Sequence, residues 1–266
     1  MKRNLAFFLL LLIAAAPSLF AQNTVGVLSF DGTQAFPGYN LIYPIGQSNV
    51  YLLDNCGRVV HTWADSAGYG PGNSVYLMDN GDMIKCKRSL SVAGDPIWAG
   101  GGGEFVEKYD WDGNLLWKMG INNSQQRLHH DIQPMDNGNV LMIVWDLKDS
   151  MDCVNAGRNP AILSEGEIWS DMIIEVEPVG TDSFNIVWQW DSWDHLIQDY
   201  DSTKDNYGQI IQHPELIDLN YDGTGSGEAD WLHFNALDYN KELDQIAISS
   251  PEFAEIWIID HSTTSA

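Results

Sequence analysis

The chain has 266 residues, with 37 Asp and Glu against 13 Lys and Arg, and its formal net charge is −24. It is 44% hydrophobic and 11% aromatic, enough apolar material for a packed core, which argues against intrinsic disorder. The negative charge would repel nucleic acid and anionic lipid, so neither is expected as a main partner. A small anionic substrate is not excluded, because a few donors in a cleft can override the mean field of the surface.

The first 21 residues have the features of a secretory signal peptide. Lys2 and Arg3 precede an apolar run over residues 5–16, and Ala21 closes a short region suited to cleavage. The alternative is an uncleaved anchor helix, but the apolar run is shorter than the roughly 20 residues that span a membrane. We therefore expect a signal peptide over residues 1–21, a mature domain over residues 22–266 without membrane attachment, and a periplasmic or secreted location.

Three cysteines, Cys56, Cys86 and Cys153, lack the paired spacing of a zinc or thioredoxin-like site. In an exported protein one pair could form a disulfide and leave the third thiol free. The odd number leaves the pairing open.

Two types of β-hairpin alternate along the chain. The first type turns at residues 79–82 and 136–139, each with an Asn-Gly pair, and again at residues 239–242. Asn-Gly between apolar runs is a strong hairpin signal, and we expect positive φ at both turn residues. The second type covers residues 50–63, 106–117 and 173–190, and each of these hairpins ends in a tryptophan.

The alternation predicts a four-stranded antiparallel sheet that recurs several times. Recurring sheets of this kind are typical of an all-β chain with a β-propeller fold. A β-sandwich is the alternative, but it does not require whole units to repeat. The long spacing predicts insertions over residues 100–103, 146–166 and 191–230. About three complete units fit, and residues 256–260 predict a strand without a following partner, so we expect a partial ring truncated at its C-terminal side.

The histidines are the strongest candidates for chemistry. Counting back seven positions from the turn residues Asn80, Asn137 and Asn240 arrives at Asn73, His130 and His233. Equivalent positions of a propeller repeat have the same spatial role, so His130 and His233 are expected to face one channel.

Several neighbours of these residues are weaker candidates. His129 lies next to His130 and would take the opposite face of a regular strand, whereas Asn235 shares the face of His233 and could donate its amide N–H to an anion. Residues 220–224 resemble half of a calcium loop but lack EF-hand spacing. The glycine run at residues 100–103 lacks the Lys of a phosphate loop, so neither a metal nor a cofactor is expected. The other histidines match no repeat position and are expected to be structural or on the surface: His61, His195, His213 and His261.

Two segments resemble the bacterial arylsulfate sulfotransferases. The first is His-His-Asp-Ile-Gln-Pro at residues 129–134, followed by Asp-Asn-Gly-Asn at residues 136–139. The second is Asp-Trp-Leu-His-Phe-Asn at residues 230–235, followed by Ser249-Ser250 and residues 256–261. The resemblance extends from about Tyr51 to the last residue.

The resemblance implies a six-bladed propeller that transfers sulfuryl groups from an aryl sulfate to a phenol in the periplasm. It implies a ping-pong route through a sulfated histidine, without a nucleotide donor. His130 and His233 would be catalytic residues that hold the sulfuryl oxygens, and His129 and Asn235 would bind substrate beside them. Asn73 is a further candidate for substrate binding because of its equal offset from the turn.

The chain departs from the family pattern in two places. The family has an Arg shortly after the paired Ser, where a bidentate donor would bind sulfate, and this chain has Pro251. The nucleophilic His of the family lies in a later blade, beyond the last residue of this sequence. We therefore keep two other function classes open: a secreted non-catalytic propeller that binds glycans or proteins, and a metal-dependent hydrolase with His ligands.

Overall fold

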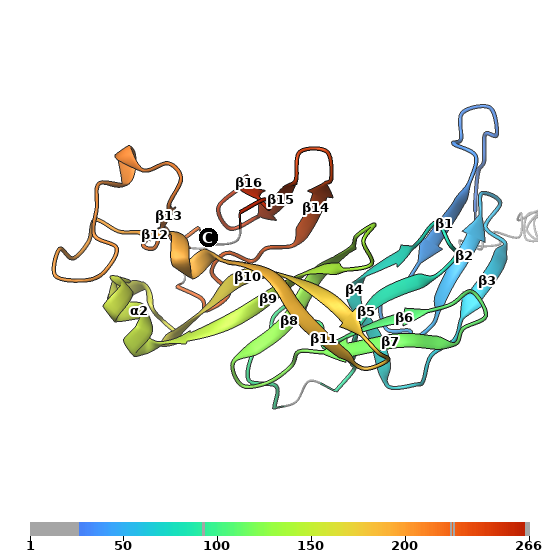
Figure 1. Cartoon of the computed structure of the whole chain (residues 1–266), viewed down its shortest axis with the longest axis horizontal. Helices are drawn as coiled ribbons and strands as arrows, with labels where there is room; N and C mark the ends of the chain where they lie inside the picture. Colours follow the sequence, from blue (N-terminus) through green and yellow to red (C-terminus); the bar gives the residue numbers. More distant parts are fainter. Residues whose placement is uncertain (1–26, 92–93, 224, 226, 264–266) are drawn as a thin grey trace, which may run out of the picture.

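The structure is a computed structural model, and it describes residues 27–91, 94–223, 225 and 227–263. The predicted signal peptide at residues 1–21 lies outside the described residues. Figure 1 shows an elongated molecule, with the sheet that holds β1, β2 and β3 at one end and an insertion with α2, β12 and β13 at the other.

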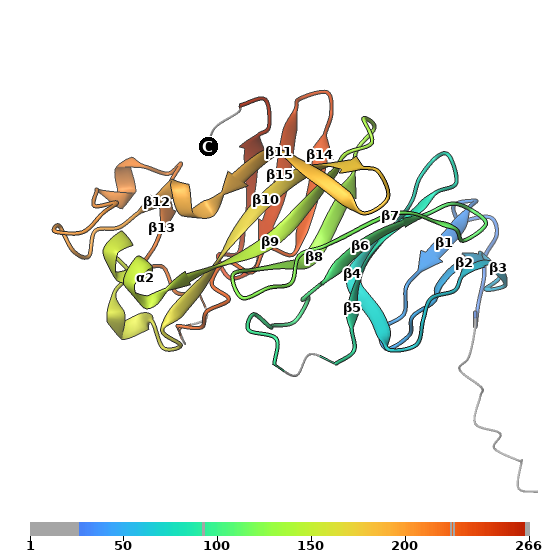
Figure 2. The same cartoon turned by 60° about the horizontal axis from the view of Figure 1, so that its bottom comes forward.

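The strands form four antiparallel sheets in chain order. The first contains β1 (Tyr39–Ile42), β2 (Val50–Asp54) and β3 (Val59–Trp63). The second contains β4 (Tyr69–Leu77), β5 (Met83–Ser89), β6 (Phe105–Tyr109) and β7 (Leu115–Gly120). The third contains β8 (Gln126–Pro134), β9 (Val140–Asp149), β10 (Glu167–Val179) and β11 (Ser183–Asp191). The fourth contains β14 (Ala236–Asn240), β15 (Gln245–Ser250) and β16 (Glu255–Asp260). The all-β prediction is thus confirmed, and Figure 2 shows the fourth sheet beside the third.

The insertions predicted after residues 146 and 191 contain the few helices of the described chain. The first holds α2 (Ser150–Ala156), the one α-helix among the described residues, and the 3-10 turn η1 (Pro160–Ile162). The second holds η2 (Ser192–His195), η3 (Ile210–Gln212) and a short parallel pair, β12 (Leu196–Ile197) with β13 (Ile217–Asp218). Asp149 caps α2, because its side chain accepts the N–H groups of Met151 and Asp152. None of the described helices has the length and apolar character needed to cross a membrane.

The Asn-Gly turns differ from the prediction in their backbone. Only Gly81 and Gly138 have positive φ, 89° and 91°, so the prediction that both turn residues do is wrong. Asn80 instead accepts the N–H of Asp82 on its side-chain oxygen, and Asn137 does the same for Asn139. This local hydrogen bond holds a longer loop in which one left-handed glycine is enough.

The third turn starts two residues later than predicted, after Asn240. The Asn240 side chain accepts the N–H groups of Glu242 and Leu243, and Asp244 supplies the left-handed residue with φ 52°. β14 therefore extends to Asn240 before the chain reverses.

A tryptophan on the last strand of each of the first three sheets reaches the following sheet. The indole N–H of Trp63 donates to the carbonyl of Asp110 at 3.0 Å, and that of Trp117 donates to Ser183 at 2.8 Å. The indole of Trp188 donates to the carbonyl of Thr263 at 2.7 Å, whereas Trp190, the predicted closing tryptophan, is buried in the core. These bonds repeat one contact between successive sheets.

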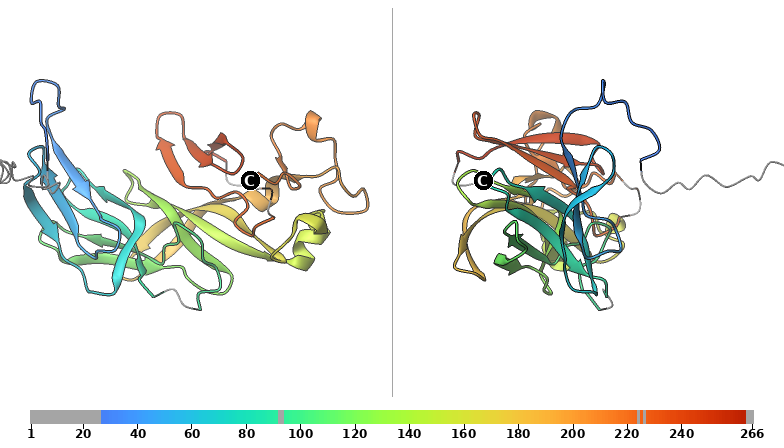
Figure 3. Two further views of the ribbon diagram at one scale, coloured as in Figure 1. Left: turned by 180° about the vertical axis from the view of Figure 1, so that it is seen from behind. Right: turned by 90° about the vertical axis from the view of Figure 1, so that its right-hand side faces the viewer.

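The first strands of the later sheets pack together and hold the candidate site. β8 packs against both β4 and β14, and Figure 3 shows these sheets from two further directions. Asp131 on β8 joins all three strands, because it accepts the Tyr76 hydroxyl at 3.0 Å and the N–H of Leu237 at 3.1 Å. The segment that follows His130 is thereby fixed relative to the segment that follows His233.

Candidate functional site

The three residues that lie seven positions before a turn Asn share an unusual backbone conformation. Their φ angles are positive: 96° at Asn73, 48° at His130 and 51° at His233. Residues other than glycine rarely adopt this left-handed region. The pairing of β4 with β5 shifts register between Pro71 and Val75, and that of β8 with β9 shifts between His129 and Ile132. A bulge thus turns the chain at the same place in successive sheets.

His130, in the bulge of β8, contacts His233, which lies just before β14. Their ring centroids lie 4.6 Å apart with an interplanar angle of 71°. Nδ1 of His233 lies 2.5 Å from Oδ2 of Asp230, three residues earlier in the chain. Nδ1 of His130 lies 3.1 Å from Nδ1 of His129. Each histidine is therefore held through Nδ1, and within the described part of the chain its Nε2 has no hydrogen-bond partner.

His129 lies behind His130 and is fully buried. Its ring stacks on Trp145, with centroids 4.0 Å apart and planes 3° from parallel. Its Nε2 lies 2.7 Å from Oδ1 of Asp171 on β10, although the ring N–H points away from the line to that oxygen. The other oxygen of Asp171 accepts the N–H of Phe234 at 3.3 Å. Consecutive histidines thus have different surroundings, because the bulge releases them from strict alternation.

The environments of these histidines shift their pKa values in opposite directions. Burial lowers the pKa of both His129 and His130 to about 3, because desolvation penalises the charged ring. The hydrogen bond to Asp230 raises the pKa of His233 above its ordinary value. Two titratable groups in contact with pKa values moved apart form a pair suited to opposite proton-transfer roles.

The glycine run at residues 100–103 packs against this pair. The carbonyl of Gly101 accepts the N–H of His130 at 2.8 Å, and a Cβ built on Gly101 would overlap the His130 ring. Gly102 forms an isolated bridge with His129. The run is therefore a close-packing element of the site.

The remaining predicted residues lie at the edge of this arrangement. Asn235 is exposed, and its side-chain oxygen accepts the Ser249 hydroxyl at 2.7 Å, so its amide N–H groups have no partner among the described residues. The Ser250 hydroxyl is buried and donates to the carbonyl of Leu232. Asn73 is exposed, and in the described ranges it makes no hydrogen bond to either histidine. The structure thus joins His129, His130 and His233, with Asn235 close in sequence and Asn73 related only by its backbone.

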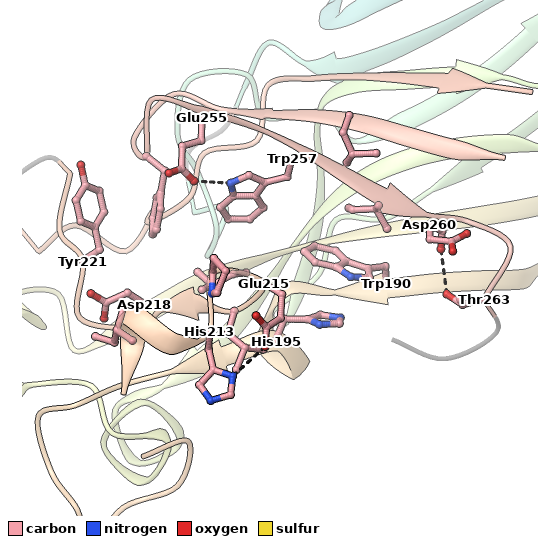
Figure 4. Close-up of a pocket in the computed structure, with 17 residues that line it drawn as sticks. Trp190, His195, His213, Glu215, Asp218, Tyr221, Glu255, Trp257, Asp260 and Thr263 are labelled. Carbon is pink, nitrogen blue, oxygen red and sulfur yellow. Dashed lines mark hydrogen bonds and ion pairs between the residues drawn. The ribbon is translucent and has the colours of Figure 1, made fainter. Parts of the chain in front are cut away.

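Two of the other histidines line a separate cavity of about 760 Å³ beside β16. Figure 4 shows His195 and His213 there with Trp190, Trp257 and several carboxylates. His195 stacks on Trp190, and partial burial lowers its pKa. Neither histidine lies with the pair formed by His130 and His233.

The remaining two histidines have structural contacts. His61 stacks on Trp111 with ring centroids 4.3 Å apart. His261 lies between β10 and the turn that follows β14, with one nitrogen 2.9 Å from Glu175 and the other 2.7 Å from Asp244.

The segment that resembles part of a calcium loop is organised by an arginine. The buried Arg158 donates to the carbonyls of Leu219, Tyr221 and Ile162. A guanidinium thus occupies the position where a cation would gather loop carbonyls. Within the described ranges no group of three or more His, Cys, Asp or Glu side chains is arranged to hold a metal ion.

Sequence reasoning missed two residues that define the site. Asp171 is a fully buried acid in β10, and its position among the apolar residues 168–174 is the signal that the sequence offers. For Gly101 the sequence predicts only an insertion over residues 100–103 that lacks the Lys of a phosphate loop. Its role depends on a loop that folds back over β8, which no local pattern encodes.

A pair of contacting imidazoles with opposed pKa shifts and free Nε2 atoms is suited to a group-transfer enzyme that needs both a donor and an acceptor. Residues 37–265 match the family model described as Arylsulfotransferase (ASST), and the chain belongs to this family. The resemblance found in the sequence is thereby confirmed. The description of this family names a sulfotransferase.

Comparison with other proteins gives two further findings. No curated protein matches the chain. Among solved structures, the crystal structure of a protein of unknown function from Bacteroides caccae at 1.35 Å resolution matches with 12% identity and a TM-score of 0.38. The match covers 86% of this chain and 61% of that one, so this chain spans less than two thirds of its length.

Proposed function

We propose that this chain carries part of the active site of an exported arylsulfate sulfotransferase. The enzyme transfers a sulfuryl group from an aryl sulfate to a phenol by a ping-pong route through a sulfated histidine, and it uses no nucleotide donor. The four successive sheets form part of a propeller ring, which by family resemblance has six blades. The observation that carries the proposal is the contact between His130 and His233, whose pKa values are shifted in opposite directions.

His233 is the donor for the sulfuryl oxygens in this proposal. Asp230 favours the protonated ring, which leaves Nε2–H free to bond an oxygen that gains charge in the transition state. Asn235 can add an amide N–H on the same side. Pro251 supplies no donor where the family has an arginine, so the positive charge of His233 has the larger role here.

His130 is the proton carrier in this proposal. Its lowered pKa keeps the ring neutral near pH 7, and its free Nε2 can take the proton of an attacking phenol. In the first half-reaction of the next turnover the same ring gives that proton to the departing phenolate, so the proton is conserved over the cycle. The nucleophile that carries the sulfuryl group is assigned by resemblance to a histidine in a later blade.

The test is sulfuryl transfer from a chromogenic aryl sulfate to a phenol by the full-length protein, with free sulfate followed in parallel. We expect His233→Ala to lower the transfer rate by on the order of 10²–10³, as loss of an oxyanion donor does. His195→Ala is the matched control, because it removes a histidine from the separate cavity, and its rate should be close to wild type.

Two results would contradict the proposal. One is wild-type transfer by both His130→Ala and His233→Ala. The other is the absence of transfer to any phenol by the intact protein. Either result would favour a secreted propeller that binds glycans or proteins without catalysis.

A further inference from the structure

We propose that Asp131 is a positioning residue, whose carboxylate holds β14 at the distance from β8 that places His233 against His130. It acts on His233 only through the backbone of Leu237. The claim on position stands on hydrogen bonds between described residues, and its catalytic consequence rests on the function proposed above.

Asp131 lies in the bulge of β8. The register between β8 and β9 shifts between His129 and Ile132, so the two residues between them stand outside the ladder. Oδ1 of Asp131 accepts the N–H of Ile132 at 2.9 Å and the hydroxyl of Tyr76 at 3.0 Å. Oδ2 accepts the N–H of Leu237 at 3.1 Å. The carboxylate is thereby bound from its own strand, from β4 and from β14.

Few other polar contacts connect these strands. Among the described residues, the bond from Tyr76 is the only hydrogen bond between β4 and β8, and the bond from Leu237 is the only one between β8 and β14. An ion pair of Lys241 with Asp136 joins the turns that follow β14 and β8, but its side chains are 70% and 77% exposed, and such pairs contribute little. The polar contribution to the strand spacing at the bulges therefore comes from one carboxylate.

Leu237 transmits the position of this carboxylate to His233. Its side chain is 4% exposed and belongs to the apolar core of the third and fourth sheets, so its N–H is a donor held in place by packing. His233 lies four residues before Leu237, and His130 directly precedes Asp131. The bond between Asp131 and Leu237 thus bridges the two segments whose rings lie 4.6 Å apart.

The contact between the rings matters for the proton transfer assigned to His130. Desolvation is the largest cause of the lowered pKa of His130, and the neighbouring His129 and His233 lower it further. If β14 moved away, His130 would gain water and lose the influence of His233. Its pKa would then return toward the ordinary value of about 6.5, and the ring would be a poorer proton acceptor near pH 7.

Two variants cut the two links separately. The asparagine of Asp131→Asn has one accepting oxygen and one NH₂ group. Its oxygen takes the place of Oδ1, where two donors point, so the NH₂ group faces the N–H of Leu237 and the bond to β14 is lost. Tyr76→Phe removes the bond to β4 and keeps the bond to Leu237. It is the matched control, because each variant removes one hydrogen bond from the same carboxylate.

The experiment uses the full-length protein with ¹³C-labelled histidine, and the spectrum of His130→Asn identifies the His130 signals. In wild type and in Tyr76→Phe we expect cross-relaxation between the rings of His130 and His233, and a His130 ring that stays neutral down to about pH 5. In Asp131→Asn we expect this cross-relaxation to weaken and the titration of His130 to move up by at least about one pH unit.

The kinetic expectation for Asp131→Asn is a loss in kcat of on the order of 10–10², because a displacement of about 1 Å is costly for a positioned group. Tyr76→Phe should keep the wild-type rate. A loss of stability alone would reduce the amount of folded protein but would leave the pKa of His130 in the folded fraction unchanged.

The wild-type protein gives an independent measurement in case Asp131→Asn does not fold. Burial is the largest influence on the pKa of Asp131 and raises it, whereas the N–H of Leu237 lowers it. The amide signal of ¹⁵N-labelled Leu237 should therefore shift as Asp131 titrates, at a pH above that of an ordinary aspartate. Tyr76 stays protonated throughout, because burial and the neighbouring Asp131 and Asp238 raise its pKa.

Wild-type ring contact and rate in Asp131→Asn would overturn the inference, and so would equal effects of Asp131→Asn and Tyr76→Phe. A Leu237 amide that does not respond to the titration of Asp131 would overturn it without any variant. If the spectra change as expected but the intact protein transfers no sulfuryl group, the inference on Asp131 stands and the proposed function fails.

Discussion

At the scale of single residues, the site depends on left-handed backbone conformations that residues other than glycine seldom adopt. His130 and His233 both have φ near 50°, and each is held by a hydrogen bond through Nδ1. Strain of this kind costs on the order of 1–3 kcal/mol per residue and persists where the surrounding structure enforces it. Here the enforcing contacts include the carbonyl of Gly101 and the carboxylate of Asp230.

We expect Gly101→Ala to displace the His130 ring and lower the transfer rate by at least tenfold. Gly101 has φ 88°, and a Cβ there would overlap the imidazole. Gly113→Ala is the matched control, because Gly113 has φ 85° but open space around its Cβ position. Both variants carry backbone strain, so the unfolding temperature should fall in both, whereas the transfer rate should fall only for Gly101→Ala. Equal rates for the two variants would contradict the packing argument.

At the scale of elements, the repeated contact between sheets is a tryptophan on the last strand of each sheet. Trp63 and Trp117 are nearly buried, and each gives its indole N–H to a carbonyl of the following sheet. Apolar burial supplies most of the stabilisation, and the hydrogen bond fixes the register between the sheets.

We expect Trp117→Phe to lower the free energy of unfolding by about 1–3 kcal/mol, since it removes one hydrogen bond and part of a buried ring. Chemical denaturation measures the change. Trp111→Phe is the control, because Trp111 is 44% exposed and bridges no sheets by hydrogen bond within the described residues. A smaller loss for Trp117→Phe than for Trp111→Phe would show that this contact does not stabilise the arrangement.

At the scale of the whole molecule, β16 is an edge strand of the described chain with strongly exposed apolar side chains. The second and third sheets have four strands each, whereas the fourth ends at β16, where Ile256 and Ile258 are 72% and 61% exposed. An unpaired edge with apolar side chains is a template for association.

We expect residues 22–266, produced alone, to self-associate, and Ile258→Lys to reduce this association by placing a charge on the edge strand. Sedimentation velocity measures the distribution of species. Ile211→Lys is the control, since Ile211 is 90% exposed in η3 and away from any sheet edge. A monodisperse wild-type monomer, or equal effects of the two lysines, would argue against the β16 edge as the contact.

The local sequence by itself determined the strands and the repeat. Apolar runs between Asn or Asp turns fix hairpins because the turn chemistry is local, and the hairpins found at residues 50–63, 79–82 and 136–139 depend on it. Because His130 and His233 lie at the same offset from their turns, the sequence predicts that the two residues lie close together, as the structure shows. The misplaced third turn followed from treating Tyr239 as a turn residue, whereas the Asn240 side chain sets the turn two residues later.

Only the tertiary structure decided which chemistry each histidine can perform. The pKa values of His130 and His233 move in opposite directions because one ring is desolvated beside a buried histidine and the other is bonded to Asp230. Asp171 lies 42 residues from His129 in sequence, and antiparallel pairing of β8, β9 and β10 brings it to 2.7 Å. Burial and long-range contacts of this kind depend on how sheets pack, so the periodicity of a single strand cannot encode them.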